Sequence, residues 1–364
     1  MKHKILVVGS GLYGSVLASE LAKKGYFVDV LDKRNHFGGN CYTEIKNNIP
    51  VHKYGPHIFH TNNQRIWSYM NGIVKFNNKK QHTKVIYEDK LYSFPINLFT
   101  LNQVYGCITP DHAKSILEDK KLSIADPKNL EEFCLANIGR ELYEIFIKGY
   151  TKKQWNKDPK ELPVSIIKRI PIRLNYNDRY FDDKFEGIPT NGYTEIFEKL
   201  LDNPKIKVIL NTDFFENKNF YLKNYKKIIY SGKVDQYFNY SYGLLEYRSL
   251  RFEETYHKND YQGNSIINYT DEKVPYTRIF ESKFFHDETV TGSWITKEYP
   301  QDYNVQEGNE PYYPVPTSKN KEIYEKYVSL MNDDQIIFGG RLGKYQYYNM
   351  DQVVASALTQ SEKF

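Results

Sequence analysis

The residues with the clearest chemical role stand near the start of the chain, where residues 9–14 read Gly-Ser-Gly-Leu-Tyr-Gly. An apolar β-branched run, residues 4–8, precedes them, and a stretch with helical apolar spacing follows. In such a strand–turn–helix unit Gly9 permits the tight turn, Gly11 lets the backbone approach a pyrophosphate, and Gly14 lets the helix pack on the strand. The N–H groups of the helix N-terminus then face the anion. The motif predicts a dinucleotide-binding turn, although glycine-rich turns also occur without a ligand.

A second predicted strand, residues 26–31, ends at Asp32. A carboxylate at this point can accept the hydroxyls of an adenosine ribose, which favours FAD or NAD over NADP. Residues 32–40 (Asp-Lys-Arg-Asn-His-Phe-Gly-Gly-Asn) resemble the extended fingerprint of the flavin family that includes amine oxidases and UDP-galactopyranose mutase. In that family the Gly-Gly pair lets the chain pass close to the flavin's phosphates and ribityl chain. The resemblance favours FAD as the cofactor.

Further stretches, spread in order over the whole chain, are similar to motifs of the UDP-galactopyranose mutase family. They are residues 51–61 (Val-His-Lys-Tyr-Gly-Pro-His-Ile-Phe-His-Thr), 148–155 (Lys-Gly-Tyr-Thr-Lys-Lys-Gln-Trp), 161–163 (Glu-Leu-Pro) with 168–171 (Lys-Arg-Ile-Pro), 274–278 (Val-Pro-Tyr-Thr-Arg), 311–314 (Pro-Tyr-Tyr-Pro) and 339–343 (Gly-Gly-Arg-Leu-Gly). By this resemblance the chain is identified as a member of the family.

The resemblance implies the interconversion of UDP-galactopyranose and UDP-galactofuranose. It requires reduced FAD, whose N5 attacks the anomeric carbon of the sugar, with no net redox change. Such a reaction asks the protein to hold a pyrophosphate leaving group and to exclude water from the sugar. Arginine suits the first task, because its planar guanidinium is always charged and matches phosphate oxygens.

Arg169 and Arg278 match the family's two pyrophosphate arginines, and Tyr180, Tyr313 and Tyr347 match its phosphate-binding tyrosines. The resemblance also implies a uridine and sugar site made by residues that include an aromatic face for uracil: Gln81, Phe146, Tyr150, Thr151, Trp155 and Asn268. It places His57 and His60 in the loop against the flavin and the sugar, where a histidine titrates near the working pH. Ordinary core packing is the alternative for Trp155 and for both histidines.

The FAD contacts implied by the motif and the resemblance come from both ends of the chain: Gly9, Gly11, Tyr13, Gly14, Asp32, Lys33, Gly39, Asn40, His57, Ile58, Arg341, Met350, Asp351 and Val354. Two positions depart from the family pattern. Asn349 stands where many members carry Asp, so a negative charge near the tyrosines is lost. Gln81 stands where a smaller Asn is common. No metal-ligand spacing is present.

The pattern of elements predicts an α/β protein: a Rossmann-like FAD-binding domain, a helical insertion domain and a mainly antiparallel β-sheet domain. We expect the FAD domain in residues 1–80, about 192–240 and 315–364, and the insertion in about 96–168, with a cap at Asn129. The sheet and substrate domain should take residues about 81–95, 169–191 and 241–314. A hairpin is expected around residues 88–90, and further strands at residues 208–210, 227–230, 289–291 and 335–338.

Composition narrows the class of protein. The net charge of +5 is spread over the chain without a long basic block, which argues against nucleic acid as a partner. No run of about 18 apolar residues and no signal-peptide core appear, so we expect a cytoplasmic protein without membrane insertion. The three cysteines, Cys41, Cys107 and Cys134, predict no disulfide framework. The expected partners are a UDP-sugar, an external reductant for FAD and, by resemblance, a second copy in a homodimer.

Three alternatives stay open from the sequence. A mutase of the same type can act on UDP-N-acetylgalactosamine. A flavin oxidoreductase, such as an amine oxidase or a protoporphyrinogen-type oxidase, shares the N-terminal signature but has no use for two pyrophosphate arginines. A protein that binds FAD without chemistry would fail to turn over any UDP-sugar.

Overall fold

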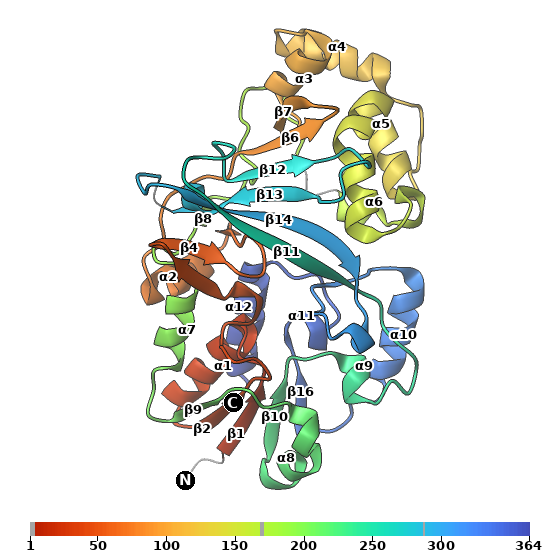
Figure 1. Ribbon diagram of the computed structural model, residues 1–364. Coiled ribbons are helices and arrows are strands. Elements are labelled where there is room, and N and C mark those ends of the chain that lie inside the picture. The colour runs from red at the N-terminus through yellow and green to blue at the C-terminus, as the bar shows by residue number, and fades with distance from the viewer. Residues whose placement is uncertain (1–3, 168–170, 287) are drawn as a thin grey trace.

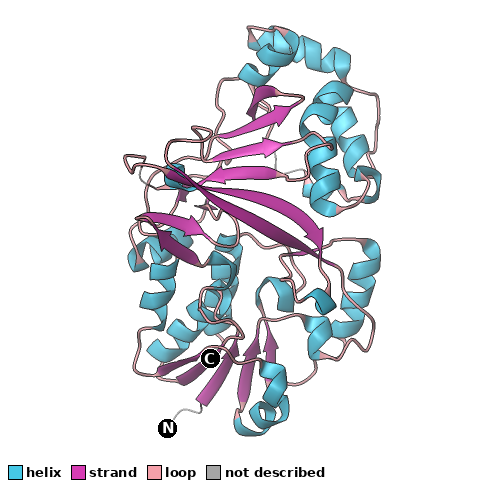
Figure 2. Cartoon of the chain, viewed as in Figure 1, coloured by secondary structure: helices cyan, strands magenta, loops and turns pink. Residues whose placement is uncertain are grey.

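The computed structural model describes residues 4–167, 171–286 and 288–364. Two β-sheets organise the chain, with helices around the lower sheet and a helical lobe beside the upper one (Figures 1 and 2). Arg169, expected to bind pyrophosphate, lies outside the described residues. The α/β class expected from the sequence is confirmed, with one parallel sheet and one largely antiparallel sheet.

The lower sheet is parallel, with strand order β16-β10-β1-β2-β9. Its strands are β1 (Lys4–Val8), β2 (Phe27–Leu31), β9 (Ile206–Ile209), β10 (Lys227–Tyr230) and β16 (Ile336–Phe338). The helices beside it include α1 (Leu12–Lys23), α2 (Gln64–Ile73), α7 (Thr194–Leu201) and α12 (Met350–Ser361). The chain winds outward from β1 in both directions, so the strand order reverses between β1 and β10. In open parallel sheets ligands bind beyond the carboxyl ends of the strands at such a point.

The upper sheet has strand order β15-β11-β14-β13-β12-β6-β7. Its strands are β6 (Thr83–Tyr87), β7 (Lys90–Phe94), β11 (Tyr247–His257), β12 (Ile266–Tyr269), β13 (Arg278–Glu281), β14 (Ser293–Asp302) and β15 (Tyr313–Pro314). All neighbours are antiparallel except β12 and β6, which are parallel. The long pair β11 and β14 crosses the middle of the molecule above the parallel sheet (Figure 1).

The helical lobe holds α3 (Leu98–Tyr105), α4 (Pro110–Lys120), α5 (Leu130–Tyr143), a π-helical turn at Glu144–Lys148 and α6 (Gly149–Trp155). Asn129 caps α5, because its side chain accepts the N–H of Glu132, as the sequence predicts. The lobe has its own apolar core, which also packs against β6 and β7. The helices therefore form a unit attached to one end of the upper sheet.

Shorter elements connect these parts. Two small two-stranded sheets pair β3 (Thr43–Lys46) with β4 (Ile49–His52) in a hairpin, and β5 (Phe59–Thr61) with the distant β8 (Phe185–Gly187). The remaining helices are α8 (Lys218–Asn224), α9 (Val234–Tyr237), α10 (Ser318–Val328) and α11 (Gly340–Gly343). No helix among the described residues is long and apolar enough to cross a membrane. Cys41, Cys107 and Cys134 are buried and unpaired.

One predicted strand is wrong. Residues 289–291 (Thr-Val-Thr) have β-branched side chains, but they form a turn and bend, and β14 begins only at Ser293. Two features explain the difference. The partner strand β11 ends at His257, which pairs with Ser293, so the ladder has no partner further along. Gly292 has a φ of +76°, which breaks the extended backbone.

Candidate active site

A cavity of about 430 Å³ lies at the carboxyl edge of the parallel sheet. The turns that follow four strands line it, through Gly9 after β1, Asp32 after β2, Ser231 after β10 and Gly340 after β16. Because parallel strands end at one edge, the fold brings together residues more than 300 positions apart. This is the place where the strand order predicts a dinucleotide site.

The glycine-rich turn has the geometry that the sequence predicts. A Cβ on Gly14 would lie 2.0 Å from the carbonyl oxygen of Gly9, so only glycine lets α1 pack this closely. Gly9 has a φ of +99°. At Gly11 the only atom near an added Cβ is the Cα of Gly39, at 3.8 Å. Gly11 is therefore free for the approach of a ligand, and its side-chain position points at cavity space, not at protein.

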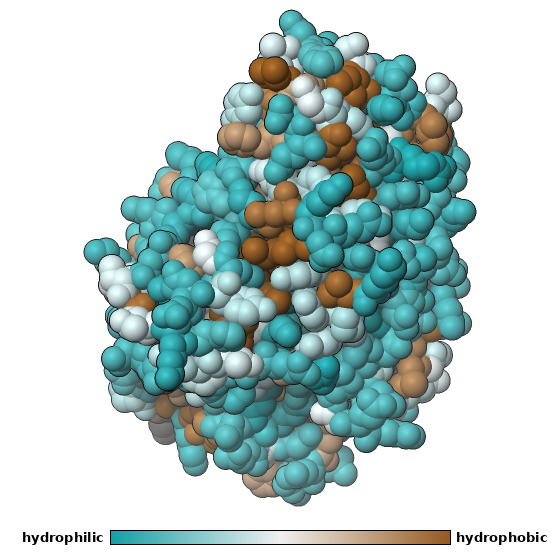
Figure 3. Space-filling model, turned by 45° about the horizontal axis from the view of Figure 1, so that its top comes forward, coloured by the Kyte–Doolittle hydropathy of each residue, from teal (hydrophilic) through white to brown (hydrophobic). Residues whose placement is uncertain are grey.

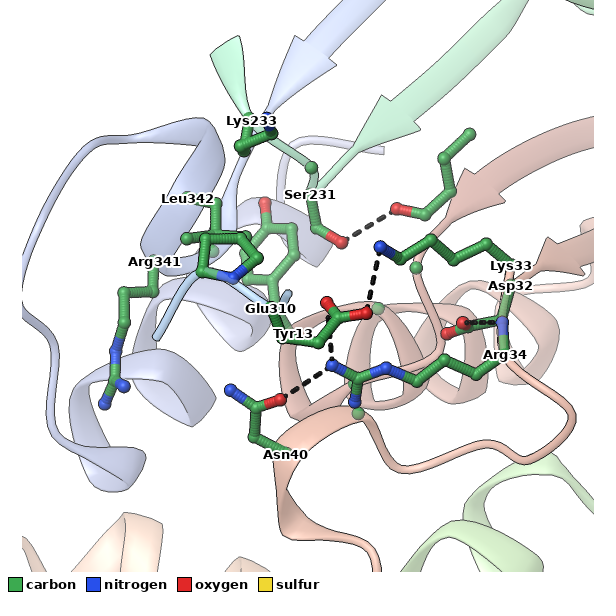
Figure 4. Close-up of a pocket in the computed structure, with 18 of the residues that line it drawn as sticks. Tyr13, Asp32, Lys33, Arg34, Asn40, Ser231, Lys233, Glu310, Arg341 and Leu342 are labelled. Atoms are coloured by element: carbon green, nitrogen blue, oxygen red, sulfur yellow. Dashed lines mark hydrogen bonds and ion pairs between the residues drawn. The ribbon is translucent and has the colours of Figure 1, made fainter. Parts of the chain in front are cut away.

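Charged side chains gather on the β2 side of this cavity (Figure 4). Glu310 accepts from Lys33 (Nζ to Oε1, 3.0 Å) and from Arg34 (Nη2 to Oε2, 3.1 Å). Arg34 also donates to Asn40 Oδ1 at 2.9 Å. Its Nη1 is buried and has no hydrogen-bond partner among the described residues. One donor of a buried cation beside the cavity is thus left for an accepting group on a ligand.

Asp32 is held by the protein. Its Oδ2 accepts the backbone N–H (2.8 Å) and the hydroxyl (2.6 Å) of Ser10, and its Oδ1 accepts the N–H of Arg34 at 3.0 Å. These bonds fix the carboxylate at the end of β2 while it lines the cavity. A carboxylate has about four lone-pair sites, so it keeps capacity for a ribose hydroxyl.

A second cavity, of about 380 Å³, lies between the first one and the upper sheet. The two cavities share part of their walls, namely Asn40, His57, Tyr312, Arg341 and Met350. Because of this shared wall, a cofactor in the first cavity would border a ligand in the second. On the face of the molecule drawn in Figure 3 most of the surface is hydrophilic, and apolar side chains gather near its middle.

Arg278 and Arg341 bring positive charge to the second cavity, and Arg278 is the one that the upper sheet carries. Its Nε and Nη2 each donate to Glu298, at 2.8 Å, and Glu298 is fully buried on the neighbouring strand β14. Burial lowers the pKa of Arg278, but the Glu298 carboxylate outweighs this and raises the pKa well above its ordinary value. The register places Asn268, Arg278 and Glu298 directly opposite one another on β12, β13 and β14. Since the fork to Glu298 fixes the guanidinium, the remaining N–H groups are oriented in advance.

Aromatic side chains surround this cation. Tyr150, Tyr180, Tyr313 and Tyr347 all line the second cavity. The rings of Tyr313 and Tyr347 lie 5.3 Å apart, and the guanidinium of Arg341 lies 5.6 Å and 5.4 Å from their centres. Burial raises the pKa of Tyr150 and of Tyr313 above the ordinary value. Both hydroxyls therefore stay protonated and able to donate to an anion at neutral pH.

His57 lies where the two cavities meet. Its Nδ1 is 2.8 Å from the carbonyl oxygen of Gly55, which makes Nδ1 the protonated nitrogen and leaves Nε2 as an acceptor. Its backbone N–H donates to Nδ1 of His52 at 3.1 Å, and Nε2 of His52 lies 3.3 Å from Nε2 of His286. Burial lowers the pKa of His57 and of His286 to about 4, and that of His52 well below its usual value.

These neutral histidines predict a loss of stability in acid. The unfolded chain binds protons near the ordinary pKa, so between about pH 6.5 and 4 it holds more protons than the native state, and the free energy of unfolding falls as the pH falls. A histidine with a native pKa of about 4 accounts for up to about 3 kcal/mol at pH 4. Urea unfolding at several pH values in this range measures how steeply the free energy of unfolding depends on pH. His286→Asn should reduce this dependence, whereas His112→Asn, at an exposed position on α4, should leave it unchanged.

His60 also lines the second cavity, but its contacts differ. Its Nδ1 lies 2.7 Å from Oδ2 of Asp183, and its ring stacks on Phe181 with the centres 3.8 Å apart. Strand β5 carries His60, while both partners belong to the segment that leads into β8. The pairing of β5 with β8 therefore brings His60 to the segment that also carries Tyr180.

Gln81 and Asn349, the two positions expected from the sequence to depart from the family pattern, line the second cavity. The Gln81 amide is bound within the protein, with Nε2 3.1 Å from Thr83 Oγ1 and Oε1 3.0 Å from Ser265 Oγ. Asn349 precedes α12, and its N–H donates to Gln352 Oε1 at 2.8 Å. This bond uses the backbone of residue 349, and the neutral Asn side chain places no charge beside the tyrosines.

The structure brings most of the predicted site residues to the two cavities. The first is lined by Gly9, Gly11, Tyr13, Gly14, Asp32, Lys33, Gly39, Asn40, His57, Arg341 and Met350. The second is lined by His57, Ile58, His60, Gln81, Tyr150, Tyr180, Asn268, Arg278, Tyr313, Arg341, Tyr347 and Met350.

Other residues predicted for the site line neither of the two cavities. Phe146 is buried and stacks on Phe94, and Thr151 is buried next to Tyr150. Trp155 lies behind Tyr347, with the ring centres 6.2 Å apart. Asp351 accepts the Thr61 hydroxyl at 2.9 Å. On α12 it is Val353, not Val354, that reaches the first cavity: both pack in the core, but Val354 is fully buried there.

Several residues of the site escaped the sequence reasoning. Glu298, Asp183 and Glu310 act through partners that are distant in the chain, and no local motif marks them. Arg34 lies within the 32–40 fingerprint, but its pairing with Glu310 is equally distant in the chain. Lys233 lines the first cavity, is almost fully buried and donates to the Tyr303 hydroxyl at 2.5 Å. For Glu298 the one available signal was a charged residue at an inward-facing position of a strand. A buried charge of this kind requires a partner.

The fold and the site define a class: a Rossmann-type protein with a cavity suited to a dinucleotide-like group beside a second cavity lined by arginine and tyrosine side chains. The family model described as UDP-galactopyranose mutase matches residues 145–347, more than half of the chain. The model described as NAD(P)-binding Rossmann-like domain matches residues 7–73.

Full-length relatives agree with this match. A probable UDP-galactopyranose mutase of Klebsiella pneumoniae is 42% identical over 99% of this chain and 94% of its own length. A dTDP-fucopyranose mutase of Escherichia coli is 39% identical over 98% and 97%. A crystal structure of reduced UDP-galactopyranose mutase shares the fold, with a TM-score of 0.78 at 15% identity, and covers 100% of this chain and 93% of that one. The chain belongs to the UDP-galactopyranose mutase family, and it is therefore an isomerase of the intramolecular transferase type.

Proposed function

We propose that the protein interconverts UDP-galactopyranose and UDP-galactofuranose, with reduced FAD in the first cavity and the UDP-sugar in the second. The observation that carries the proposal is the wall shared by the two cavities at Asn40, His57, Tyr312, Arg341 and Met350. A cofactor that reacts directly with a sugar needs this adjacency. The choice of UDP-galactose as the sugar nucleotide is inferred from the names of the relatives.

The residues of the first cavity fit FAD. The open side of Gly11 and the facing Gly39 leave room for a pyrophosphate at the N-terminus of α1. The unpartnered Nη1 of Arg34 can donate to an oxygen of the same group. Asp32 stands at the end of β2, where a ribose hydroxyl is expected. When bound and reduced, FAD supplies a nucleophile, N5, for the anomeric carbon of the sugar.

The residues of the second cavity fit a nucleotide diphosphate as leaving group. Arg278, fixed by Glu298, places its free N–H groups toward the negative charge that develops when the glycosidic C–O bond breaks. Tyr150, Tyr180, Tyr313 and Tyr347 add neutral donors around the same space. We propose that Arg169 supplies the second guanidinium. Burial keeps the His57 ring neutral, so its Nε2 can accept a hydrogen bond from an N–H or O–H group of the cofactor or the sugar.

A second candidate substrate comes from one relative. The Escherichia coli protein named dTDP-fucopyranose mutase is nearly as similar as the Klebsiella one. Its substrate carries thymine instead of uracil and lacks the sugar's 6-hydroxyl. UDP-N-acetylgalactosamine remains a third candidate. The fold likeness to a putative protoporphyrinogen oxidase, with a TM-score of 0.68 at 12% identity, shows shared architecture only.

Turnover of purified protein tests the function. We expect a flavin absorption spectrum, and conversion of UDP-galactofuranose to UDP-galactopyranose, followed by chromatography, only after reduction with dithionite. The same assay with dTDP-fucofuranose and with the UDP-N-acetylgalactosamine furanose form ranks the substrates by kcat/KM. Flavin without turnover of any of the three would argue for an oxidoreductase or a non-catalytic flavoprotein. A protein without flavin would contradict the assignment of the first cavity.

We further propose a homodimer in the cytoplasm that relies on an external reductant to keep FAD reduced. Gel filtration with light scattering measures whether the protein is a homodimer. The reductant can be identified as the component that sustains turnover when dithionite is left out of the assay.

A further inference from the structure

The segment of residues 171–184 passes the second cavity without forming a helix or a strand. It carries Tyr180 and Phe181, which line the cavity, and Phe181 stacks on His60. A coil of this length does not position two ligand-facing rings by its own backbone hydrogen bonds. The order of this segment must come from side chains and from its neighbours.

Asp178, which contacts His82 and Lys84, contributes to that order. Arg179, which pairs with Glu186, contributes to it as well.

Arg173 contributes to this order from within the segment. Its side chain is only 8% exposed, and its guanidinium lies inside the turn made by residues 177–182. Nη1 donates to the carbonyl oxygens of Asn177 (3.0 Å) and Arg179 (2.6 Å), and Nη2 to Oδ1 of Asp182 (2.5 Å). Three acceptors on both sides of Tyr180 and Phe181 thus converge on one cation.

Backbone bonds tie the same segment to the rest of the protein. The N–H of Arg173 donates to Ile96 at 2.9 Å, and the N–H of Tyr180 donates to Gln81 at 2.7 Å. Arg173 is therefore fixed at its backbone to the segment after β7, while its side chain holds the turn that presents Tyr180. Its guanidinium itself is absent from the walls of both cavities.

We propose that Arg173 is a positioning residue for substrate binding: it holds the 177–182 turn in the conformation that presents Tyr180 and Phe181 to the sugar nucleotide. This inference rests on the proposed function of the second cavity as the UDP-sugar site. Without the guanidinium, the carbonyls of Asn177 and Arg179 lose their buried donor, and the turn populates other conformations.

A fall in the population of the binding-competent turn has a specific kinetic signature. The apparent Kd rises by the inverse of that population, whereas bound substrate selects the competent turn and reacts at the usual rate. Loss of charge-assisted hydrogen bonds of this kind predicts a rise in KM of about 10- to 100-fold, with a much smaller change in kcat. Loss of a group that acts in the transition state would instead lower kcat.

The test compares Arg173→Met, Arg173→Lys and Asp182→Asn with Arg65→Met as matched control, since Arg65 is an exposed arginine on α2 paired only with Glu362 at the surface. UDP alone is titrated against the FAD-loaded proteins, kcat and KM are measured, and hydrogen exchange is followed on the amides of residues 177–182. Arg173→Met should weaken UDP binding, raise KM and speed exchange in this turn. Arg173→Lys should restore part of each, Asp182→Asn should have a small effect because Asp182 is 62% exposed, and Arg65→Met none.

Two results overturn the inference: unchanged exchange and UDP affinity in Arg173→Met, or a fall in kcat at unchanged KM. If Arg173→Met does not fold, Arg173→Lys carries the test, because it keeps the buried charge but not the planar fork. Failure of the proposed function is recognised separately, because the unchanged protein would then bind no UDP, while hydrogen exchange still reports whether Arg173 holds the turn.

Discussion

Arg278→Ala should lower turnover by about 10³-fold or more while the protein keeps its FAD, because a fixed cation next to a developing negative charge has an effect of this size. Arg278 lines only the second cavity, so the cofactor cavity keeps its wall. The measurement is kcat/KM of the reduced protein together with the flavin-to-protein ratio. Near-normal turnover in a folded, FAD-loaded variant would remove Arg278 from the site.

The design must separate catalysis from folding, because Glu298 is fully buried and would lose its partner. An uncompensated buried carboxylate costs about 3–5 kcal/mol of stability. The double variant Arg278→Met with Glu298→Gln removes both charges and should recover much of that stability without recovering turnover. Arg278→Lys should lie between, since an ammonium keeps the charge but cannot reproduce the two parallel bonds from Nε and Nη2. Equal turnover in Arg278→Lys and in the double variant would show that the positive charge at position 278 has no role.

Gly11→Val should give a folded protein that binds its cofactor more weakly. The only atom near a new Cβ is the Cα of Gly39, at 3.8 Å, so the protein accommodates the side chain, which then occupies the space for the pyrophosphate. Overpacking at a filled site costs about 1–3 kcal/mol, which corresponds to about a 5- to 160-fold weaker FAD affinity. FAD titration into apoprotein measures the change, and stoichiometric FAD in this variant would contradict the phosphate-turn assignment.

Two other glycines complete this experiment. Gly14→Ala places a Cβ 2.0 Å from the Gly9 carbonyl oxygen, so it should lower the stability of the apoprotein itself. Gly72→Ala meets nothing within 4 Å on α2 and should keep both FAD and stability. Because a ligand that binds only the native state stabilises it by mass action, added FAD should raise Tm in wild type and Gly72→Ala but much less in Gly11→Val.

The sequence alone determined the elements whose signals are local. Residues 4–31 predict strand, turn, helix and strand, and the structure has β1, α1 and β2 there. The cap at Asn129 and the strand at Lys227–Tyr230 could also be predicted from the sequence. The reason is that turn geometry, capping and apolar periodicity depend on neighbours within a few positions. The family motifs added the expected site residues, most of which the structure brings to two adjoining cavities.

Only the tertiary structure decided how those residues are held. Arg278 stands in a recognisable motif, but its partner Glu298 follows from the register between β13 and β14. Likewise Glu310 joins Lys33 and Arg34 across most of the chain, and Arg173 finds its acceptors only once the 177–182 turn has formed. On α12 one step of about 100° separates Val353, which lines the cavity as well as packing in the core, from Val354, which is fully buried in the core. Hydrogen bonds and burial depend on which segments meet in space, so no local pattern along the chain specifies them.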